Sequence, residues 1–277
     1  MTWNPGFLDR SPMLRPLAAG AEALRASADW PDRLLLQSLI DSAGVANARG
    51  MPIRLIEPGA AQSAGYEPDV YERGELQVRE RQWHDLFNVL AWIAYPLTKA
   101  ALNARHVEAM REKRLEAPRG TAAAVRNRGR VQDALTVLDE SGAIFASCDE
   151  DLIEDLQSFR WKQLFWTKRR RVLEQVRVCV FGHAIFEKAL KPYVGMTGHA
   201  LPLRVPGAFL EAPSQRQLQL IDERAAVIVA EATSLASPQA LAPLPLLGVP
   251  GWWPENERES FYDNTAYFRP GRGRGEH

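Results

Sequence analysis

The stretch RQWHDLFNVLAWIAYP, residues 81–96, decides the structure of the region around it. Projected at about 100° per residue, its apolar side chains gather on one side of a helix over residues 82–95. His84, Asn88 and Tyr95 share a different stripe, with Asp85 at its edge. A solvated helix face usually carries Lys, Glu and Gln instead. This stripe therefore predicts a recessed polar surface.

A proline separates this helix from the next one. Pro96 suits the first turn of a new helix and forces a bend, so we expect a second helix over residues 97–114. Lys99, Asn103 and His106 stand at positions i, i+4 and i+7 of that helix and form one stripe. If the two helices meet at an angle, both polar stripes face a common cleft.

The composition is that of an ordinary globular protein. Of 277 residues, 46% are hydrophobic and 25% are charged, and Lys+Arg equals Asp+Glu at 34 each. The net charge is therefore zero, and it gives no indication of binding to nucleic acid or to an anionic membrane. Cys148 and Cys179 are too few and too isolated for a disulfide framework and indicate reduced thiols. The N-terminus lacks the pattern of a signal peptide, and no run of about 18 apolar residues occurs. We expect a cytoplasmic protein without a membrane span.

The remaining segments alternate between helical and extended patterns, which predicts an α+β fold. Further helices are expected over residues 14–28, 31–44, 161–171, 183–190 and 215–234, and an acidic one capped by Asp149. Strands are expected over residues 53–56, 176–181 and 197–205, and a β-hairpin over residues 131–146 with its turn at 140–142. Residues 59–79 predict a loop with extended pieces, including Tyr71 and Glu72, and residues 111–130 an exposed basic loop.

These elements predict a single domain over residues 1–270. A helical layer packs on a small, mainly antiparallel sheet in this fold. Residues 1–12 are expected to form an extended arm, because prolines limit early helix there. The segment from Pro243 to Pro270 is rich in Pro, Gly and aromatic residues and is expected to wrap across the domain. Residues 271–277 predict a disordered tail.

Several short motifs follow one another along the chain in a recognisable order. They are residues 83–88 (WHDLFN), 95–103 (YPLTKAALN), 133–136 (DALT), 139–142 (DESG), 181–183 (FGH), 187–188 (EK), 248–254 (GVPGWWP) and 261–263 (FYD). Together they resemble the bacterial family named domain of unknown function 3025, from about residue 71 onward. The resemblance implies one domain. That family has no assigned function, so it supplies no catalytic residues.

A metal site is the first chemical interpretation of the sequence. His183 and Glu187 stand at i and i+4 on a short helix directly after a strand, which lets both reach one divalent ion such as Zn, Mn or Fe. His84, Asp85 and His106 are further ligand types, as is His199. Neither H-E-x-x-H nor C-x-x-C is present. The alternative for the His183–Glu187 pair is a hydrogen bond or ion pair on a helix surface.

Acid–base catalysis without a metal is the second interpretation. His84 would be the general base, oriented by Asp85 or Asp139, with Lys99 or Asn88 stabilising charge. Adjacent helix residues diverge by about 100°, so His84 and Asp85 do not pair easily and a distant partner is needed. The candidates are Asp133, Asp139 and Glu140. In the structural alternative, His84 and Asn88 hydrogen-bond loop backbone and fix the C-terminal segment.

The sequence thus predicts a hydrolase acting on a small molecule, metal-assisted or metal-free. Its polar cleft would combine His84, Asp85, Asn88, Lys99, His106, His183 and Glu187. No Gly-x-Ser-x-Gly elbow and no phosphate-binding glycine loop occurs. The alternative is a non-catalytic binding protein. It would contact nucleic acid through the basic residues of 111–130 and 168–171, although the zero net charge disfavours this.

Overall fold

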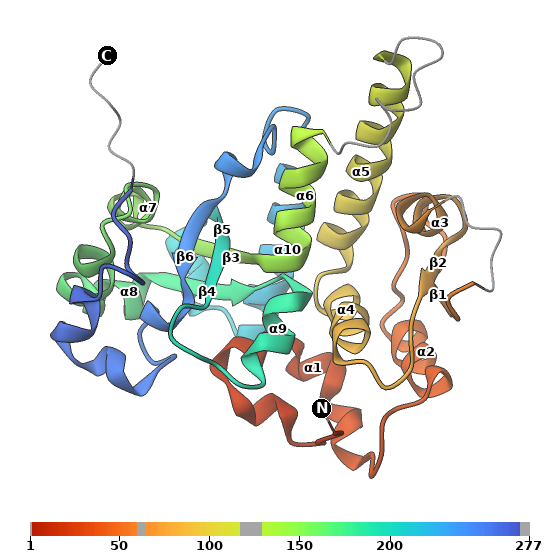
Figure 1. Cartoon of the computed structure of the whole chain (residues 1–277), viewed down its shortest axis with the longest axis horizontal. Helices are drawn as coiled ribbons and strands as arrows, with labels where there is room; N and C mark the ends of the chain where they lie inside the picture. The colour runs from red at the N-terminus through yellow and green to blue at the C-terminus, as the bar shows by residue number, and fades with distance from the viewer. Residues whose placement is uncertain (1, 60–64, 117–128, 272–277) are drawn as a thin grey trace.

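The structure, a computed structural model, describes residues 2–59, 65–116 and 129–271. Four strands form the main sheet, in the spatial order β4-β3-β5-β6 (Figure 1). Their bounds are Val176–Val180 for β4, Gly142–Ser147 for β3, Thr197–Arg204 for β5 and Ala242–Pro245 for β6. The β3–β4 and β5–β6 pairs are antiparallel and the β3–β5 pair is parallel. The predicted α+β fold with a small, mainly antiparallel sheet is confirmed.

A second, two-stranded parallel sheet pairs β1 with β2, and ten α-helices surround the two sheets in the described residues. Strand β1 is Arg54–Ile56 and β2 is Glu75–Gln77. The helices are α1 (Ala18–Ala21), α2 (Arg33–Ser42), α3 (Tyr66–Arg73), α4 (Trp83–Ala94), α5 (Pro96–Glu116), α6 (Arg130–Ser141), α7 (Glu150–Gln157), α8 (Arg169–Gln175), α9 (His183–Ala189) and α10 (Ser214–Ala230). Short 3-10 turns connect many of them. No described helix has the length and apolar character needed to cross a bilayer.

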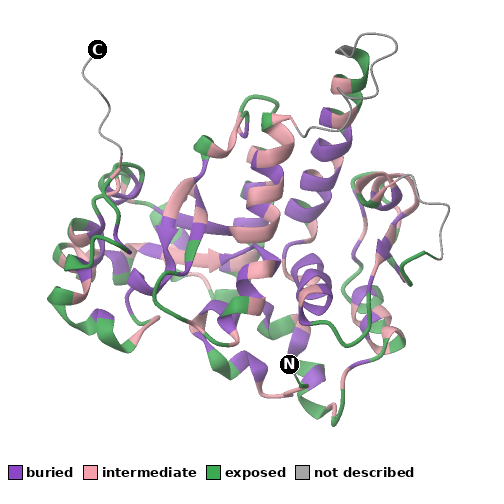
Figure 2. Ribbon diagram, in the orientation of Figure 1, coloured by how far each residue is buried: buried purple, intermediate pink, exposed green. Residues whose placement is uncertain are grey.

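The main sheet buries both of its faces, because successive side chains of a strand point to opposite sides. On β3, Ala143 and Phe145 join the cluster that contains α4, α9 and the N-terminal turns. Ile144 and Ala146 join the second cluster, with α6 and α10. All six residues of β3 are buried, so this strand is the centre of the core (Figure 2).

Helix α4 is buried around most of its circumference, as the pattern of residues 82–95 predicts. Nine of its residues are buried, among them Asn88 and Asp85. Its first residue, Trp83, lies in an aromatic cluster at ring-centroid distances of 5.4 Å from Trp3 and 4.9 Å from Trp30. This cluster anchors the N-terminal segment to the start of α4.

The bend at Pro96 is held by a carboxylate from a distant helix. Asp222 of α10 accepts hydrogen bonds from the backbone amides of Leu97 (3.0 Å) and Thr98 (2.8 Å). The hydroxyl of Thr98 donates to the backbone oxygen of Asp222 at 3.1 Å. A carboxylate at this position satisfies amides that have no partner within the helix and interacts favourably with the helix dipole. Asp222 of α10 therefore caps the first turn of α5 and fixes the position at which this helix begins.

Three local predictions are wrong. Residues 131–139 form helix α6 and not a hairpin strand, because the spacing of the buried Leu135 and Leu138 follows the helical period. Residues 66–77 form α3 and β2 where a loop is expected, and Gly74 ends α3 in the left-handed conformation (φ 69°). The N-terminal arm is not extended: Phe7–Arg10 is a 3-10 helix whose Phe7 is fully buried.

The C-terminal segment wraps over the sheet edge, as predicted. The fully buried Asn256 donates to the backbone oxygens of Leu247 and Val249, both at 2.8 Å. The indole of Trp161 donates to the backbone oxygen of Arg269 at 2.8 Å. The Asn256 bonds hold the segment together internally. The Trp161 bond, and a bond from the hydroxyl of Tyr267 to the backbone oxygen of Met196 at 2.7 Å, attach it to the core as a clasp. The predicted tail lies outside the described residues beyond Gly271.

Replacement of the capping carboxylate tests the role of the Pro96 bend. Asp222→Ala should lower the free energy of unfolding by about 1–2 kcal/mol, because two backbone amides at the start of α5 lose their acceptor. Asp222→Asn should lower the free energy of unfolding by less, since the amide oxygen of asparagine still accepts one hydrogen bond. Burial raises the pKa of Asp222 because it disfavours the charged carboxylate, and asparagine carries no charge to disfavour. Urea unfolding measures both; equal losses for Ala and Asn would contradict the capping role.

Candidate functional site

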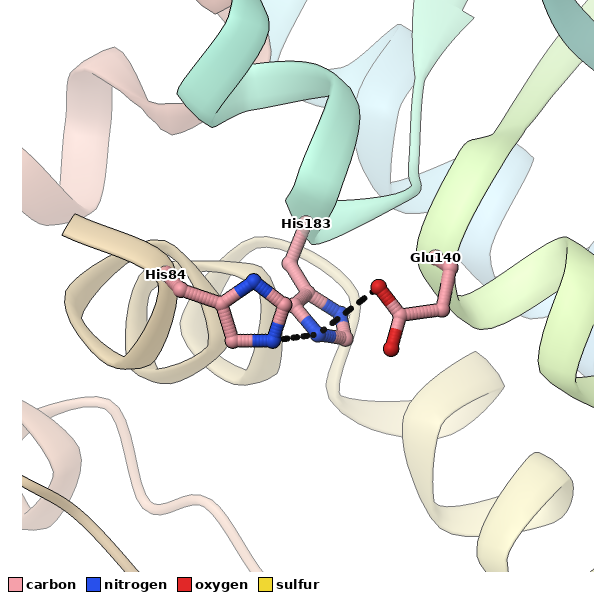
Figure 3. A group of neighbouring side chains, drawn as sticks. All are labelled: His84, Glu140 and His183. Atoms are coloured by element: carbon pink, nitrogen blue, oxygen red, sulfur yellow. Dashed lines mark hydrogen bonds and ion pairs between the residues drawn. The ribbon is translucent and has the colours of Figure 1, made fainter.

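Two histidines from distant parts of the chain meet at the start of two helices (Figure 3). His84 lies in the first turn of α4 and His183 is the first residue of α9. Their Nε2 atoms are 3.0 Å apart. Glu140, next to the last residue of α6, places Oε2 3.6 Å from Nε2 of His183. One ligand atom from each of the three residues lies within 4.8 Å of the others.

A close approach of two glycine backbones brings His183 to Glu140. The amides of Phe181 and Gly182 both donate to the backbone oxygen of Gly142 at 2.9 Å. A Cβ atom on Gly182 would lie 2.5 Å from the backbone carbon and oxygen of Glu140. Only glycine fits at this crossing, so the start of α9 can rest against the end of α6. The position of His183 follows from that contact.

Each histidine also has a carboxylate on its other ring nitrogen. Oε2 of Glu187 lies 3.5 Å from Nδ1 of His84, and Oδ2 of Asp139 lies 3.7 Å from Nδ1 of His183. These separations are longer than hydrogen bonds, so the interactions are electrostatic in this arrangement. Both imidazoles consequently present Nε2 to each other and Nδ1 to an acidic side chain.

A buried lysine lies behind the histidines. Lys99 is 2% exposed; its ammonium group forms an ion pair with Asp139 and donates to Oδ1 of Asn88 at 2.9 Å. Burial alone would raise the pKa of Asp139, but Lys99 and His183 outweigh burial and hold that pKa below its usual value. Burial lowers the pKa of His183 to about 4, against the opposing effect of Asp139. His183 is therefore neutral near pH 7.

These groups open onto a cavity of about 690 Å³ between α3, α4, α5 and α6. Helix α6 lines it with a stripe at i, i+4 and i+8, and α3 and α5 line the other side. The side chains that matter most are Gln132, Thr136 and Glu140 on α6, Tyr66 on α3 and His106 on α5. A pocket of this size and mixed polarity suits a small molecule.

The structure brings most of the predicted site residues to this cavity. His84, Asn88, His106 and His183 line its wall. Lys99 lies one layer behind, bonded to Asn88. His106 is buried, with Nε2 at 3.9 Å from a carboxylate oxygen of Glu67 on α3. A cavity therefore lies where the cleft across the Pro96 bend is predicted, lined by His84, Asn88 and His106 but not by Lys99.

Two of the predicted partners differ in the structure. The carboxylate of Asp85 is occupied by Arg79, whose Nη2 donates to Oδ1 at 2.8 Å and whose backbone amide donates to Oδ2 at 2.7 Å. Burial would raise the pKa of Asp85, but these contacts lower it overall. Asp85 thus fixes the entry to α4 and does not orient His84. The carboxylate of Glu187, predicted to act together with His183, lies against Nδ1 of His84.

The comparison with known families adds one result. The model of the family described as "Protein of unknown function (DUF3025)" matches residues 53–272, which is most of the chain. The chain belongs to the DUF3025 family. The match includes His84, Glu140 and His183, and the name of the family assigns no activity to them. No curated protein and no solved structure matches the chain.

Glu140 and Tyr66 belong to the site of this DUF3025 chain although the local sequence pattern does not place them there. Glu140 is a candidate partner of His84 in the sequence, but it is expected in a hairpin turn. The polar stripe Gln132, Thr136 and Glu140 is the signal that indicates helix α6. Tyr66 is expected in a loop. The glutamate and proline in its first turn and the glycine after its last turn are typical helix boundaries.

The second basic cluster, Lys168 to Arg171, is neutralised within the protein. Lys168 forms ion pairs with Asp151 and Asp155. Its three neighbours are paired too: Arg169 with Glu257, Arg170 with Glu174, and Arg171 with Asp149 and Asp151. These charges stabilise the contacts among α7, α8 and the C-terminal clasp. In the first cluster, residues 117–128 lie outside the described residues. The predicted basic loop is wrong at its start, because Arg111, Lys113 and Arg114 belong to helix α5, and Arg111 pairs with Glu72.

Removal of the buried lysine tests whether it organises the site. Lys99→Met should lower the free energy of unfolding by about 3–5 kcal/mol, because Asp139 keeps a buried charge without its cation. The double variant Lys99→Met/Asp139→Asn should recover a large part of that loss, because it removes both charges. A double-mutant cycle by denaturant unfolding gives the coupling. Additive losses would show that the two groups act independently.

Proposed function

We propose that this DUF3025 protein is a metal-dependent hydrolase whose ion is bound by Nε2 of His84, Nε2 of His183 and a carboxylate oxygen of Glu140. The observation that carries the proposal is the convergence of these three ligand atoms within 4.8 Å, at the wall of the 690 Å³ cavity. The residues come from three helices, α4, α9 and α6. Two histidines and one glutamate are a donor set typical of catalytic zinc.

The distances between the donor atoms fit one small ion. Two ligands at about 2.0–2.1 Å from zinc in tetrahedral geometry are separated by roughly 3.3 Å. The observed separations from Nε2 of His183 are 3.0 Å to His84 and 3.6 Å to Glu140. The third separation, between His84 and Glu140, is within 4.8 Å, so rotation of these side chains toward one another would complete the site.

The groups behind the histidines support the same proposal. A histidine that binds a metal usually presents its other nitrogen to a carboxylate, which fixes the ring orientation. His84 has Glu187 in that position and His183 has Asp139. Metal binding also requires a neutral imidazole, and His183 is neutral near pH 7.

Hydrolysis is the chemistry that best suits this arrangement. Three protein ligands leave one coordination position for a solvent molecule or a substrate on the cavity side. A divalent ion held in this way lowers the pKa of bound water and polarises a substrate oxygen. The 3.0 Å contact between the histidines is also the length of a hydrogen bond. If the protein binds no ion, two alternatives remain. The histidine pair would serve acid–base catalysis in a metal-free enzyme, or it would be a structural contact in a non-catalytic binding protein.

Metal binding by the purified protein tests the proposal. Elemental analysis and titration with Zn²⁺ should show one ion per chain. His84→Ala, His183→Ala and Glu140→Gln should each weaken binding by roughly 100-fold or more, because each removes one of three ligands. His199→Ala is the matched control: His199 bonds Ser141 outside the cluster and should leave binding unchanged. Folded wild-type protein that binds no ion would exclude the metal-dependent function.

The carboxylate behind His84 provides a finer test. Glu187→Gln should weaken Zn²⁺ binding by about 10- to 100-fold, since the amide no longer holds the imidazole with a negative charge. Glu187 is partly exposed, so the variant should fold normally. Glu174→Gln on α8, where the glutamate pairs with Arg170, is the control for an ion pair outside the site. Isothermal titration calorimetry compares the affinities, and equal values would remove Glu187 from the site.

A further inference from the structure

A chain of hydrogen bonds runs from the buried ion pair to a tyrosine in the cavity wall. Lys99 pairs with Asp139 and donates to Oδ1 of Asn88 at 2.9 Å. The amide nitrogen of Asn88 donates to the hydroxyl oxygen of Tyr66 at 2.9 Å. Tyr66 is the first residue of α3 and lines the same cavity as His84 and His183.

The chemistry of Lys99 fixes the direction of these bonds. An ammonium group has three donors and no acceptor, so the Asn88 atom that faces Lys99 must be the carbonyl oxygen. The amide nitrogen of Asn88 then faces Tyr66, and the Tyr66 oxygen must accept. The phenolic proton consequently points away from Asn88 and can be donated to another group.

The hydroxyl of Tyr66 keeps this proton at neutral pH. A phenol is protonated at neutral pH even at its ordinary pKa of about 10. Tyr66 is 37% exposed as a residue, but burial around its hydroxyl, followed by the negative charges of Glu67 and Asp139, raises its pKa further. Asn88, which binds this hydroxyl, lies one helical turn after His84 on α4, and Tyr66, His84 and His183 all line the same cavity. A substrate atom can therefore lie between the hydroxyl and the histidine pair.

We propose that Tyr66 donates a hydrogen bond to the carbonyl oxygen of an acyl substrate, an ester or amide, as negative charge develops on that oxygen. The inference rests on the proposed hydrolytic function. Water forms a bond to the carbonyl carbon and the carbonyl electron pair moves to the oxygen, which accepts from Tyr66. The carbonyl then re-forms, the bond to the leaving group breaks, and a proton from the water goes to the leaving group.

The charges around Tyr66 favour an acyl group over a phosphoryl group. Phosphoryl-transfer sites stabilise their substrates with Arg or Lys side chains as well as metal ions. Here Lys99, the cation nearest to Tyr66 in the hydrogen-bond chain, is buried and paired with Asp139, so it is not available to bind a phosphoryl group. A neutral phenol that donates one hydrogen bond suits an uncharged carbonyl compound.

Among the described residues, Arg79, Lys113 and Arg114 are the other cations that line the cavity. Arg79 is held by the carboxylate of Asp85. Lys113 and Arg114 line the cavity from the last part of α5. They follow His106 by about two helical turns, which is roughly 10 Å along the axis of α5. These two charges therefore suit a distant, negatively charged part of a substrate better than its reacting group.

Binding of acetohydroxamate to the Zn²⁺-loaded protein tests the role of Tyr66. This probe ligates the ion through oxygens that also accept a hydrogen bond. Tyr66→Phe should weaken its binding by about 10-fold or more, since one hydrogen bond to a charged group is lost. Zn²⁺ affinity should not change, because Tyr66 is not a ligand. Tyr71→Phe on the same helix is the control, since Tyr71 packs against Arg49 and Arg111.

The outcomes separate the two proposals. Equal acetohydroxamate affinity for wild-type protein and Tyr66→Phe, with Zn²⁺ bound to both, would overturn the role of Tyr66 and leave the metal site intact. Absence of Zn²⁺ binding would overturn the proposed function together with this inference. Turnover of p-nitrophenyl acetate gives the second readout: Tyr66→Phe should lower kcat and leave KM nearly unchanged. Faster turnover of bis(p-nitrophenyl) phosphate than of the acetate would overturn the substrate class.

Discussion

The ion pair between Lys99 and Asp139 is the interaction on which the site depends. It joins α5 to α6 in the interior, and each partner extends to a different functional group. Asp139 faces His183 of α9, while Lys99 reaches Asn88 of α4. A buried ion pair contributes little net stability, because removing both charges from water costs about as much as their attraction returns. Its role here is geometric: the helices must adopt one relative position for both charges to be satisfied.

The sheet supplies the second constraint. Strand β3 lies at the centre of the core and follows directly after α6. The carboxylates of Asp139 and Glu140 therefore lie just before the first residue of this inner strand. Strand β4 pairs with β3 and leads through Gly182 directly into His183. On the opposite wall, the aromatic cluster around Trp83 seats the first turn of α4, which carries His84. The two histidines therefore meet because helices α4 and α9, which carry them, are each held in place by packing.

The elements with strong periodicity are predictable from the sequence. Helix α4, the bend at Pro96, helix α5, and the strand-to-helix junction at Gly182 all follow from local patterns. Helix α6 carries two conflicting signals: Val131, Thr136 and Val137 favour a strand locally, while the spacing of Leu135 and Leu138 is helical. Packing on β3 and α10 decides for the helix. A shared cleft for His84 and His183 can be hypothesised from the sequence, but their contact depends on the approach of Gly182 to Glu140. Local sequence does not encode that approach, since it joins segments that are distant in the chain.

The contact between His84 and His183 joins residues 99 positions apart in the chain, and Glu140 comes from a third helix between them. Such a cluster does not exist in the unfolded chain, where each side chain is an isolated weak ligand. Any ion that binds to it therefore favours the native state by mass action, and this stabilisation grows with the logarithm of the ion concentration. The fraction of chains with a bound ion then reports whether α4, α6 and α9 are packed together as in the native state. Loss of packing in the aromatic cluster of Trp3 and Trp83, which holds the first turn of α4, would therefore weaken ion binding at the histidines.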